Sequence, residues 1–106
     1  MRSSEQEWVA EYLDDLLALW SQHADTPSGL FNPWLDRQWR HHTDGPRTLV
    51  SQCRLIYNFA RAHERSGDPR FADLAHRGIA ALIQFFRDAD GAGWVWSCDA
   101  DCRVQD

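Results

Sequence analysis

The 106-residue sequence predicts an all-α fold built from antiparallel helical hairpins, with one small β-hairpin near its end. Three observations support this class. Apolar residues recur at helical spacing in three segments, residues 66–69 separate two of these segments by a very short turn, and residues 94–99 alternate between apolar and polar as a strand does. We expect a single region with helices at about 4–23, 47–65 and 69–87 and a hairpin at about 93–106.

The first predicted helix, about 4–23, is amphipathic. Its apolar residues recur at helical steps and are Trp8, Val9, Tyr12, Leu13, Leu16, Leu17 and Trp20. Its acidic residues take the other face and are Glu5, Glu7, Glu11, Asp14 and Asp15. The acids lie toward the N-terminus, where the helix dipole favours negative charge. This pattern predicts an amphipathic helix of about five turns.

Residues 24–47 form a long connection that contains Gly29, Pro33 and the pair His41-His42. A connection of this length inside a compact domain is uncommon unless it is functional or belongs to a larger architecture. Adjacent residues on extended backbone point in opposite directions, so the two histidines are not expected to share one ligand. We expect them to be exposed loop histidines.

The second predicted helix, about 47–65, is apolar over most of its circumference. One face carries Leu49, Cys53, Ile56, Tyr57 and Ala60, and the apolar surface is widened by Val50, Leu55 and Phe59. The remaining polar strip consists of Ser51, Arg54, Asn58 and Arg61. A helix with so much apolar surface is expected to be surrounded by other elements. Arg54 then either extends to the surface or points into a cavity, and the pattern leaves both readings open.

The residues Ser66-Gly-Asp-Pro69 predict a sharp turn between the second and third helices. Gly67 suits a left-handed C-cap, Asp68 an N-cap and Pro69 the first helical position. Helices joined this closely are antiparallel neighbours. After the third helix, residues 94–99 are expected to form a strand with Trp94 and Trp96 on one side. A turn at 99–102 and a return strand from 103 would complete the hairpin.

The composition excludes several classes of function. A net charge of −5 and the lack of lysine argue against a nucleic-acid surface. The apolar runs are too short to span a membrane, and the first residues lack the apolar core of a signal peptide, so a cytoplasmic location is predicted. Three cysteines without a secretion signal predict reduced thiols, and their spacing with the histidines predicts no metal site and no cofactor. The six tryptophans either fill the core or stack on sugars.

Three segments resemble the N-acylglucosamine 2-epimerase superfamily, which includes the cellobiose 2-epimerases and mannose isomerases. Residues 49–59 (LVSQCRLIYNF) resemble its first inner helix, where a glutamine or asparagine precedes an arginine by two positions. Residues 66–71 (SGDPRF) resemble its inner-to-outer helix turn, and residues 86–99 (FRDADGAGWVWSCD) its first long hairpin. Weaker similarities lie at 28–31 and 35–37. Together the similarity covers most of residues 5–106.

The resemblance implies that this chain forms the first repeats, the N-terminal portion, of an (α/α)6 barrel. It implies epimerisation at C2 of a sugar, or aldose–ketose isomerisation, through an enediolate and without a metal or other cofactor. Two histidines would move the proton, and a mono- or disaccharide would be the substrate. On this resemblance the substrate-binding residues are Arg54, Asn58 and Trp94, because an arginine matching Arg54 projects into the cavity of family members.

The family's catalytic histidines belong to later inner helices. None of the five histidines of this chain occupies a matching position, and they are His23, His41, His42, His63 and His76. The sequence therefore predicts an N-terminal fragment of a sugar epimerase or isomerase that is inactive alone, with a missing C-terminal portion or self-association covering its apolar faces. The alternative is a non-catalytic helical module that oligomerises through those faces or binds carbohydrate through its tryptophans.

Overall fold

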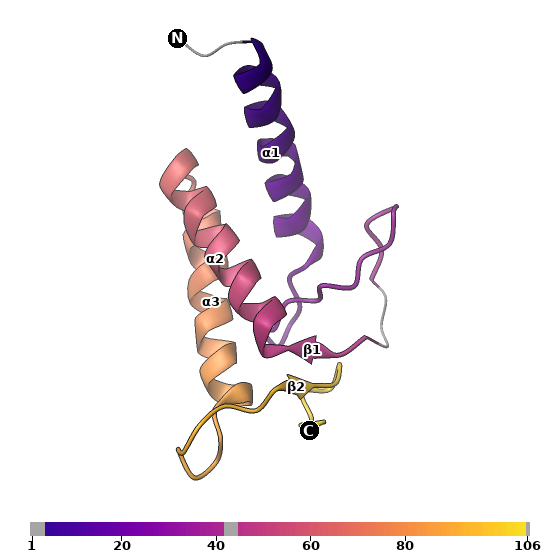
Figure 1. Cartoon of the computed structure of the whole chain (residues 1–106), viewed down its shortest axis with the longest axis vertical. Helices are drawn as coiled ribbons and strands as arrows, with labels where there is room; N and C mark the ends of the chain where they lie inside the picture. The colour runs from indigo at the N-terminus through magenta and orange to yellow at the C-terminus, as the bar shows by residue number, and fades with distance from the viewer. Residues whose placement is uncertain (1–3, 42–44, 106) are drawn as a thin grey trace.

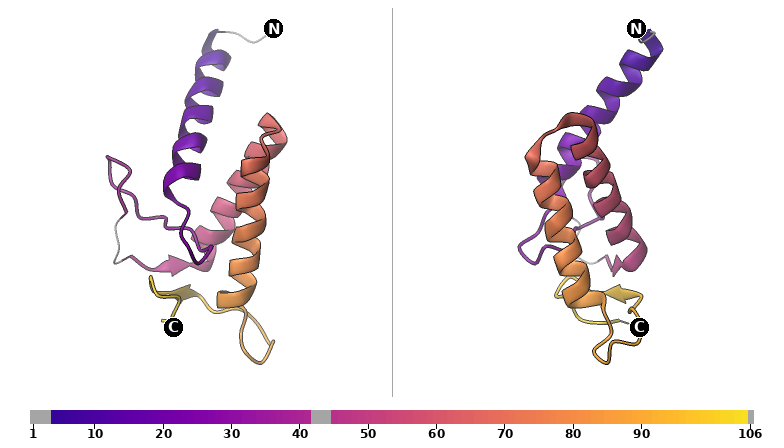
Figure 2. Two further views of the ribbon diagram at one scale, coloured as in Figure 1. Left: turned by 180° about the vertical axis from the view of Figure 1, so that it is seen from behind. Right: turned by 90° about the vertical axis from the view of Figure 1, so that its left-hand side faces the viewer.

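The computed structural model describes residues 4–41 and 45–105, and this part of the chain is mainly helical (Figure 1). Helices α1 (Ser4–His23), α2 (Leu49–Ser66) and α3 (Pro69–Phe86) are accompanied by two short strands, β1 (Arg47–Thr48) and β2 (Ser97–Cys98). α2 and α3 lie side by side and antiparallel, whereas α1 leans away from them and extends past their connecting turn (Figure 2). The predicted all-α class with a small β element is confirmed.

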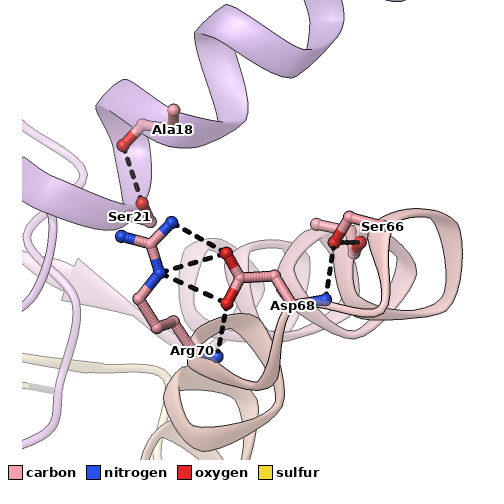
Figure 3. A network of polar contacts seen from close by, with 6 residues as sticks. Ala18, Ser21, Ser66, Asp68 and Arg70 are labelled. Carbon is pink, nitrogen blue, oxygen red and sulfur yellow. Dashed lines mark hydrogen bonds and ion pairs between the residues drawn. The ribbon is translucent and has the colours of Figure 1, made fainter.

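The turn between α2 and α3 has the predicted caps, and Figure 3 shows the contacts of Asp68. Gly67 is left-handed, with φ +72°, and its N–H donates to the carbonyl of His63 at 2.7 Å. Asp68 caps α3 by accepting from the backbone N–H of Arg70 at 3.0 Å, and Pro69 occupies the first turn. The Arg70 guanidinium also donates to the Asp68 carboxylate at 2.7 Å, and this side-chain hydrogen bond lowers the pKa of Asp68.

The main core lies between α2, α3 and the connection that follows α1. The ring of Phe31 packs against Phe59 with centroids 5.0 Å apart, and Phe59 packs against Phe71 at 6.3 Å. Phe31 and Phe59 are fully buried. A second, smaller core cluster near β2 contains Leu30, Ala81, Phe86 and Cys98. The connection is therefore part of the core, because it supplies the Phe31 side chain that fills the space between two helices.

The buried face of α2 is not the apolar face that the helical spacing identified. The structure buries Gln52, Leu55, Phe59 and Ala62 against α3 and the connection. Cys53, Tyr57 and Ala60, which the sequence pattern placed on one apolar face, are exposed, and Tyr57 is 63% exposed. Because α2 is apolar over most of its circumference, helical periodicity alone could not decide which of two faces meets α3.

The predicted hairpin at about 93–106 is only partly present. β2 pairs antiparallel with β1, with Arg47 opposite Cys98 and Thr48 opposite Ser97. The return strand is reduced to one bridge between Cys98 and Val104, closed by a hydrogen bond from Asp99 N–H to the Arg103 carbonyl at 2.8 Å. The two strands that pair are about fifty residues apart, so the local alternation that predicted a hairpin could not identify this partner.

The pairing with β2 also changes where α2 begins. Arg47 and Thr48 are strand residues, and the helix starts at Leu49, whose N–H donates to the Trp96 carbonyl at 2.8 Å. Thr48 and Ser51 form a capping box, since the Thr48 side chain accepts from Ser51 N–H and the Ser51 side chain accepts from Thr48 N–H. These contacts tie the tryptophan segment to the first turn of α2.

Candidate functional site: the groove between α1 and α2

A groove, here named the α1–α2 groove, runs between these helices from Val9 near the N-terminal end of α1 to Pro33 in the connection. Its apolar lining from α1 consists of Val9, Ala10, Leu13, Leu16, Leu17 and Trp20. Its polar lining from α2 consists mainly of Arg54, Asn58, Arg61 and Arg65. These four residues are spaced by four, three and four positions, so they form one strip along a single face of the helix.

Arg54 lies at the end of the α1–α2 groove that faces the connection, beside Trp20, Pro33 and Val50. Its side chain is exposed. Within residues 4–41 and 45–105, none of the ion pairs involves Arg54. Because a guanidinium carries five N–H donors and keeps its charge, an arginine without a carboxylate partner is suited to bind ligand oxygens.

The two other arginines of the groove are already paired. Arg61 donates to Glu64 at 2.8 Å, and Arg65 donates to Asp14 on α1 at 2.9 Å. The pair between Arg65 and Asp14 links the two walls of the groove. The difference in pairing distinguishes Arg54 chemically from its neighbours along the same strip.

The structure places two of the three predicted substrate-binding residues together. Asn58 is exposed one helical turn after Arg54, in the same groove. Trp94 is 51% exposed and lies in the segment after α3, where it bridges to Arg87. It is not among the residues that line the described part of the groove. The aromatic residue beside Arg54 is instead Trp20, which the sequence identified only as part of an apolar helix face.

Gln52 is a supporting residue that the sequence identified only as the glutamine of the family motif, two positions before Arg54, without a structural role. Its side chain is 1% exposed. Its Oε1 accepts from Phe31 N–H at 2.8 Å, and its Nε2 donates to the Phe31 carbonyl at 2.8 Å. One amide therefore satisfies both backbone groups of a fully buried residue. This contact fixes the connection, including Pro33, beside Arg54.

None of the histidines that the structure describes lines the α1–α2 groove. His23 lies near Trp39, with ring centroids 6.1 Å apart, and a ring nitrogen of His41 contacts the His23 carbonyl. His63 and His76 are exposed, and His42 lies outside the described residues. Among residues 4–41 and 45–105 there is also no group of three side chains that could hold a metal ion.

Helices in this part of the chain are too short or too polar to cross a membrane.

A turn at residues 36–40 supports Trp20, the tryptophan that lines the groove. The Asp36 carboxylate accepts from the N–H groups of Gln38 and Arg40 at 2.8 and 2.9 Å, and from the Arg40 guanidinium at 3.0 Å. Trp39 adopts φ +63° in this turn, and its ring meets the ring of Trp20 edge-on at 5.4 Å. The hydrogen bond from the Arg40 backbone is the largest cause of the lowered pKa of Asp36.

We expect acid to loosen this turn. Because the folded pKa of Asp36 is depressed, its contribution to stability is present above the unfolded pKa of about 3.9 and is lost as pH falls through the folded pKa. NMR amide shifts of Gln38 and Arg40, followed against pH, should move together below about pH 4. Asp36→Asn keeps the acceptor without the charge and should abolish this transition. An unchanged transition in that variant would contradict the assignment to Asp36.

Comparisons with known proteins support the helical fold. A D-mannose isomerase crystal structure matches 93% of this chain with a TM-score of 0.79 and 25% sequence identity. The cellobiose 2-epimerase of Spirochaeta thermophila DSM 6192 matches 98% with a TM-score of 0.73 and 19% identity. That of Bacillus thermoamylovorans B4167 matches 96% with a TM-score of 0.53 and 14% identity.

The chain spans only part of these structures, covering 25%, 28% and 42% of their respective lengths. The two cellobiose 2-epimerases are similar in fold, and the D-mannose isomerase is similar in fold and, more weakly, in sequence. A sequence model of the N-acylglucosamine 2-epimerase family matches residues 29–106, which include most of the connection and all of β1, α2, α3 and β2. The predicted resemblance is thereby confirmed over well more than half of the sequence, and the chain belongs to the N-acylglucosamine 2-epimerase family.

Proposed function

We propose that this chain forms part of the sugar-binding site of a sugar 2-epimerase or aldose–ketose isomerase, in which Arg54 holds substrate oxygens. The observation that carries the proposal is the position of Arg54 at the mouth of the α1–α2 groove without a carboxylate partner among the described ion pairs. Asn58 offers a second polar group one turn away, and Trp20 offers an apolar wall. Family membership and the similarity to a D-mannose isomerase support a mono- or disaccharide substrate.

Arg54 has a chemical role in this proposal. Removal of the proton at C2 of an open-chain sugar produces an enediolate, whose negative charge develops on oxygen. A guanidinium stays charged at every relevant pH, so it can stabilise that oxygen in the transition state. The proton itself requires groups that titrate near neutrality, which is the usual role of histidine.

The histidines of this chain do not fill that role in the proposal. Those that the structure describes lie away from the groove lining that contains Arg54. We therefore assign substrate binding to Arg54 and Asn58, and we assign proton transfer to histidines that are not among these 106 residues. The 106-residue chain alone should bind a sugar weakly and should not turn it over.

A hydrogen–deuterium exchange experiment tests the assignment of proton transfer to histidines outside these 106 residues. The chain, incubated in D2O with D-mannose or cellobiose, should incorporate no more deuterium at C2 than buffer does, because no acid/base residue lies beside Arg54 in the described structure. Proton NMR of the sugar measures the exchange directly. Incorporation above buffer would contradict the assignment and would place the proton-transferring group within this chain.

NMR of the arginine side chains tests the assignment of substrate binding to Arg54 and Asn58. Titration of the labelled chain with D-mannose or D-fructose should shift the Nε–Hε resonance of Arg54, because its donors are available to sugar oxygens. Arg54→Gln should abolish sugar-dependent shifts at Asn58, whereas Arg61→Gln, on the same strip but paired with Glu64, should leave them unchanged. Equal losses in both variants would indicate a nonspecific effect of positive charge and would contradict the role of Arg54.

A further inference from the structure

Arg47 is a buried arginine just before the start of α2. It belongs to β1, which pairs with β2 at this end of the helix (Figure 1), and only 6% of the residue is exposed. Burial lowers the pKa of Arg47 because it disfavours the charged form, and the acidic groups of Cys102 and Asp99 partly offset this effect. A guanidinium nevertheless keeps its proton in proteins, so Arg47 is a buried positive charge.

One edge of the Arg47 guanidinium has no protein partner in the described structure. Nη1 donates to the Gly45 carbonyl at 2.8 Å, whereas Nε and Nη2 donate to none of residues 4–41 and 45–105. These two nitrogens are not among the enclosed unpaired atoms of the described residues, so both keep contact with solvent. Nε and Nη2 share one edge of the guanidinium plane, where two parallel N–H groups match the two oxygens of a carboxylate. The free edge is therefore suited to bind a carboxylate bidentately.

Arg47 also lines a pocket of about 320 Å³, which is large enough for a small molecule. The pocket lies between the connection, β1 and the turn after β2, and its other lining residues include Thr26, Ser28, Leu30, Asp101 and Cys102. The Thr26 hydroxyl donates to the Leu30 carbonyl and lies 3.1 Å from the Ser28 hydroxyl, so these groups are already engaged within the connection. None of the described residues that line this pocket also lines the α1–α2 groove, so the pocket is separate from the candidate sugar site.

Two aspartates near the pocket determine which anion fits. Asp99 attracts Arg47 from beyond ion-pair distance, and its Oδ1 instead accepts from the N–H groups of Asp101 and Arg103 at 2.9 and 3.0 Å. Asp101 lines the pocket, is exposed and forms no ion pair with Arg47. These carboxylates repel a doubly charged ligand more strongly than a singly charged one. The pocket therefore favours a monoanion.

We propose that this pocket, here named the Arg47 pocket, binds the carboxylate of a small organic acid through the Nε–Nη2 edge of Arg47. The carboxylate compensates a buried positive charge to which the described residues offer one carbonyl and no ion pair. A ligand in the pocket contacts both of its walls and so joins the connection to the turn after β2. Because binding favours the folded state, the acid should also raise the melting temperature. The proposal does not depend on the sugar site.

NMR titration of the labelled 106-residue chain tests the binding. Sodium acetate, added at constant ionic strength with sodium chloride as the balance, should shift the Nε–Hε resonance of Arg47 along a saturating curve with a Kd of about 1–10 mM. Sodium phosphate at neutral pH and the same ionic strength should bind more weakly, because much of it is doubly charged. The lack of a saturable shift with acetate, or tighter binding of phosphate than of acetate, would overturn the proposal.

Asp101→Asn is a variant that should bind acetate more tightly. Removing a like charge from the pocket should lower the Kd by about twofold or more. Asp90→Asn is the matched control, because it makes the same change at an exposed position outside the pocket, and it should leave the Kd unchanged. Equal effects of the two variants would mean that only the overall charge matters, and would contradict the assignment to this pocket.

Arg47→Gln removes the proposed partner of the carboxylate. It should abolish the saturable acetate-dependent shift of the Ser28 amide, which lies on the opposite wall of the pocket. Because Arg47 is buried, circular dichroism checks that this variant folds, and Asp101→Asn still decides the question if it does not. Unchanged acetate binding by folded Arg47→Gln would overturn the proposal.

Discussion

Replacing Gln52 with leucine is expected to lower the free energy of unfolding by about 2–6 kcal/mol, because two buried backbone groups would each lose a partner at about 1–3 kcal/mol. The groups are the N–H and the carbonyl of Phe31, both held at 2.8 Å by one amide. Phe31 is fully buried, so water does not replace the lost contacts. Leucine is close to glutamine in size, and the loss therefore reports hydrogen bonding rather than a cavity. Chemical denaturation measures it.

Gln84→Leu makes the same chemical change on an exposed face. Gln84 lies on α3 and is exposed, so the substitution should change stability by no more than about 0.5 kcal/mol. Equal effects of the two substitutions would show that the Gln52 amide contributes no more than a surface glutamine does, and would contradict the assigned role.

Gln52→Glu adds a pH-dependent version of the same experiment. The glutamate keeps an acceptor for Phe31 N–H but, when ionised, presents a negative oxygen to the Phe31 carbonyl. Burial and that carbonyl raise the folded pKa of the carboxyl above its unfolded value of about 4.3. The protonated carboxyl can donate as the amide does, so the contribution to stability is fully present below pH 4.3 and is lost as pH rises through the folded pKa. The variant should be more stable at pH 4 than at pH 7.

Features set by short-range chemistry could be predicted from the sequence. Gly67, Asp68 and Pro69 gave the end of α2 and the start of α3, because each residue has its own conformational preference or hydrogen-bonding group at a helix end. Asn58 could be placed beside Arg54, because four positions make one turn of a helix. The helical class followed from the same local rules.

Features set by contacts between distant residues could not be predicted. Phe31 and Gln52 are 21 positions apart, and nothing local in either segment identifies the other. β1 and β2 are each two residues long, so their side chains carry too little alternation to specify a partner. The face of α2 that meets α3 could not be predicted for a related reason, since apolar side chains surround the helix and several faces satisfy the same period.

Gln52 and Arg54 show how α2 contributes both to the core and to the candidate sugar site. Two positions along a helix correspond to a rotation of about 200°, so the two side chains leave α2 on nearly opposite sides. Gln52 points into the core and holds the connection, and Arg54 is exposed in the groove whose mouth that connection helps to form. The buried contact therefore determines where Pro33 lies relative to Arg54. A change at Gln52 should alter the groove as well as the stability of the fold.

A second large effect is expected at Gly78, where α3 approaches the same core. A Cβ atom at this position would lie 2.6 Å from the ring of Phe31 and 2.8 Å from the side chain of Ile56. The ring cannot move aside, because it is fully buried against Phe59 and its backbone is held by Gln52. We expect Gly78→Ala to destabilise the chain by about 1–3 kcal/mol through overpacking, even though alanine favours a helix by about 1 kcal/mol over glycine. Thermal or chemical denaturation measures the difference.

A double-mutant cycle separates this clash from other effects of the substitution. Phe31→Leu alone should be destabilising, because it removes a buried ring and leaves a cavity. In Gly78→Ala combined with Phe31→Leu, the new methyl group should occupy part of the space that the ring vacated. The two losses should then fall short of additivity by about 0.5–3 kcal/mol. Strictly additive losses would mean that the alanine methyl group does not meet Phe31, and that the close approach of α3 to the connection is not what requires glycine at this position.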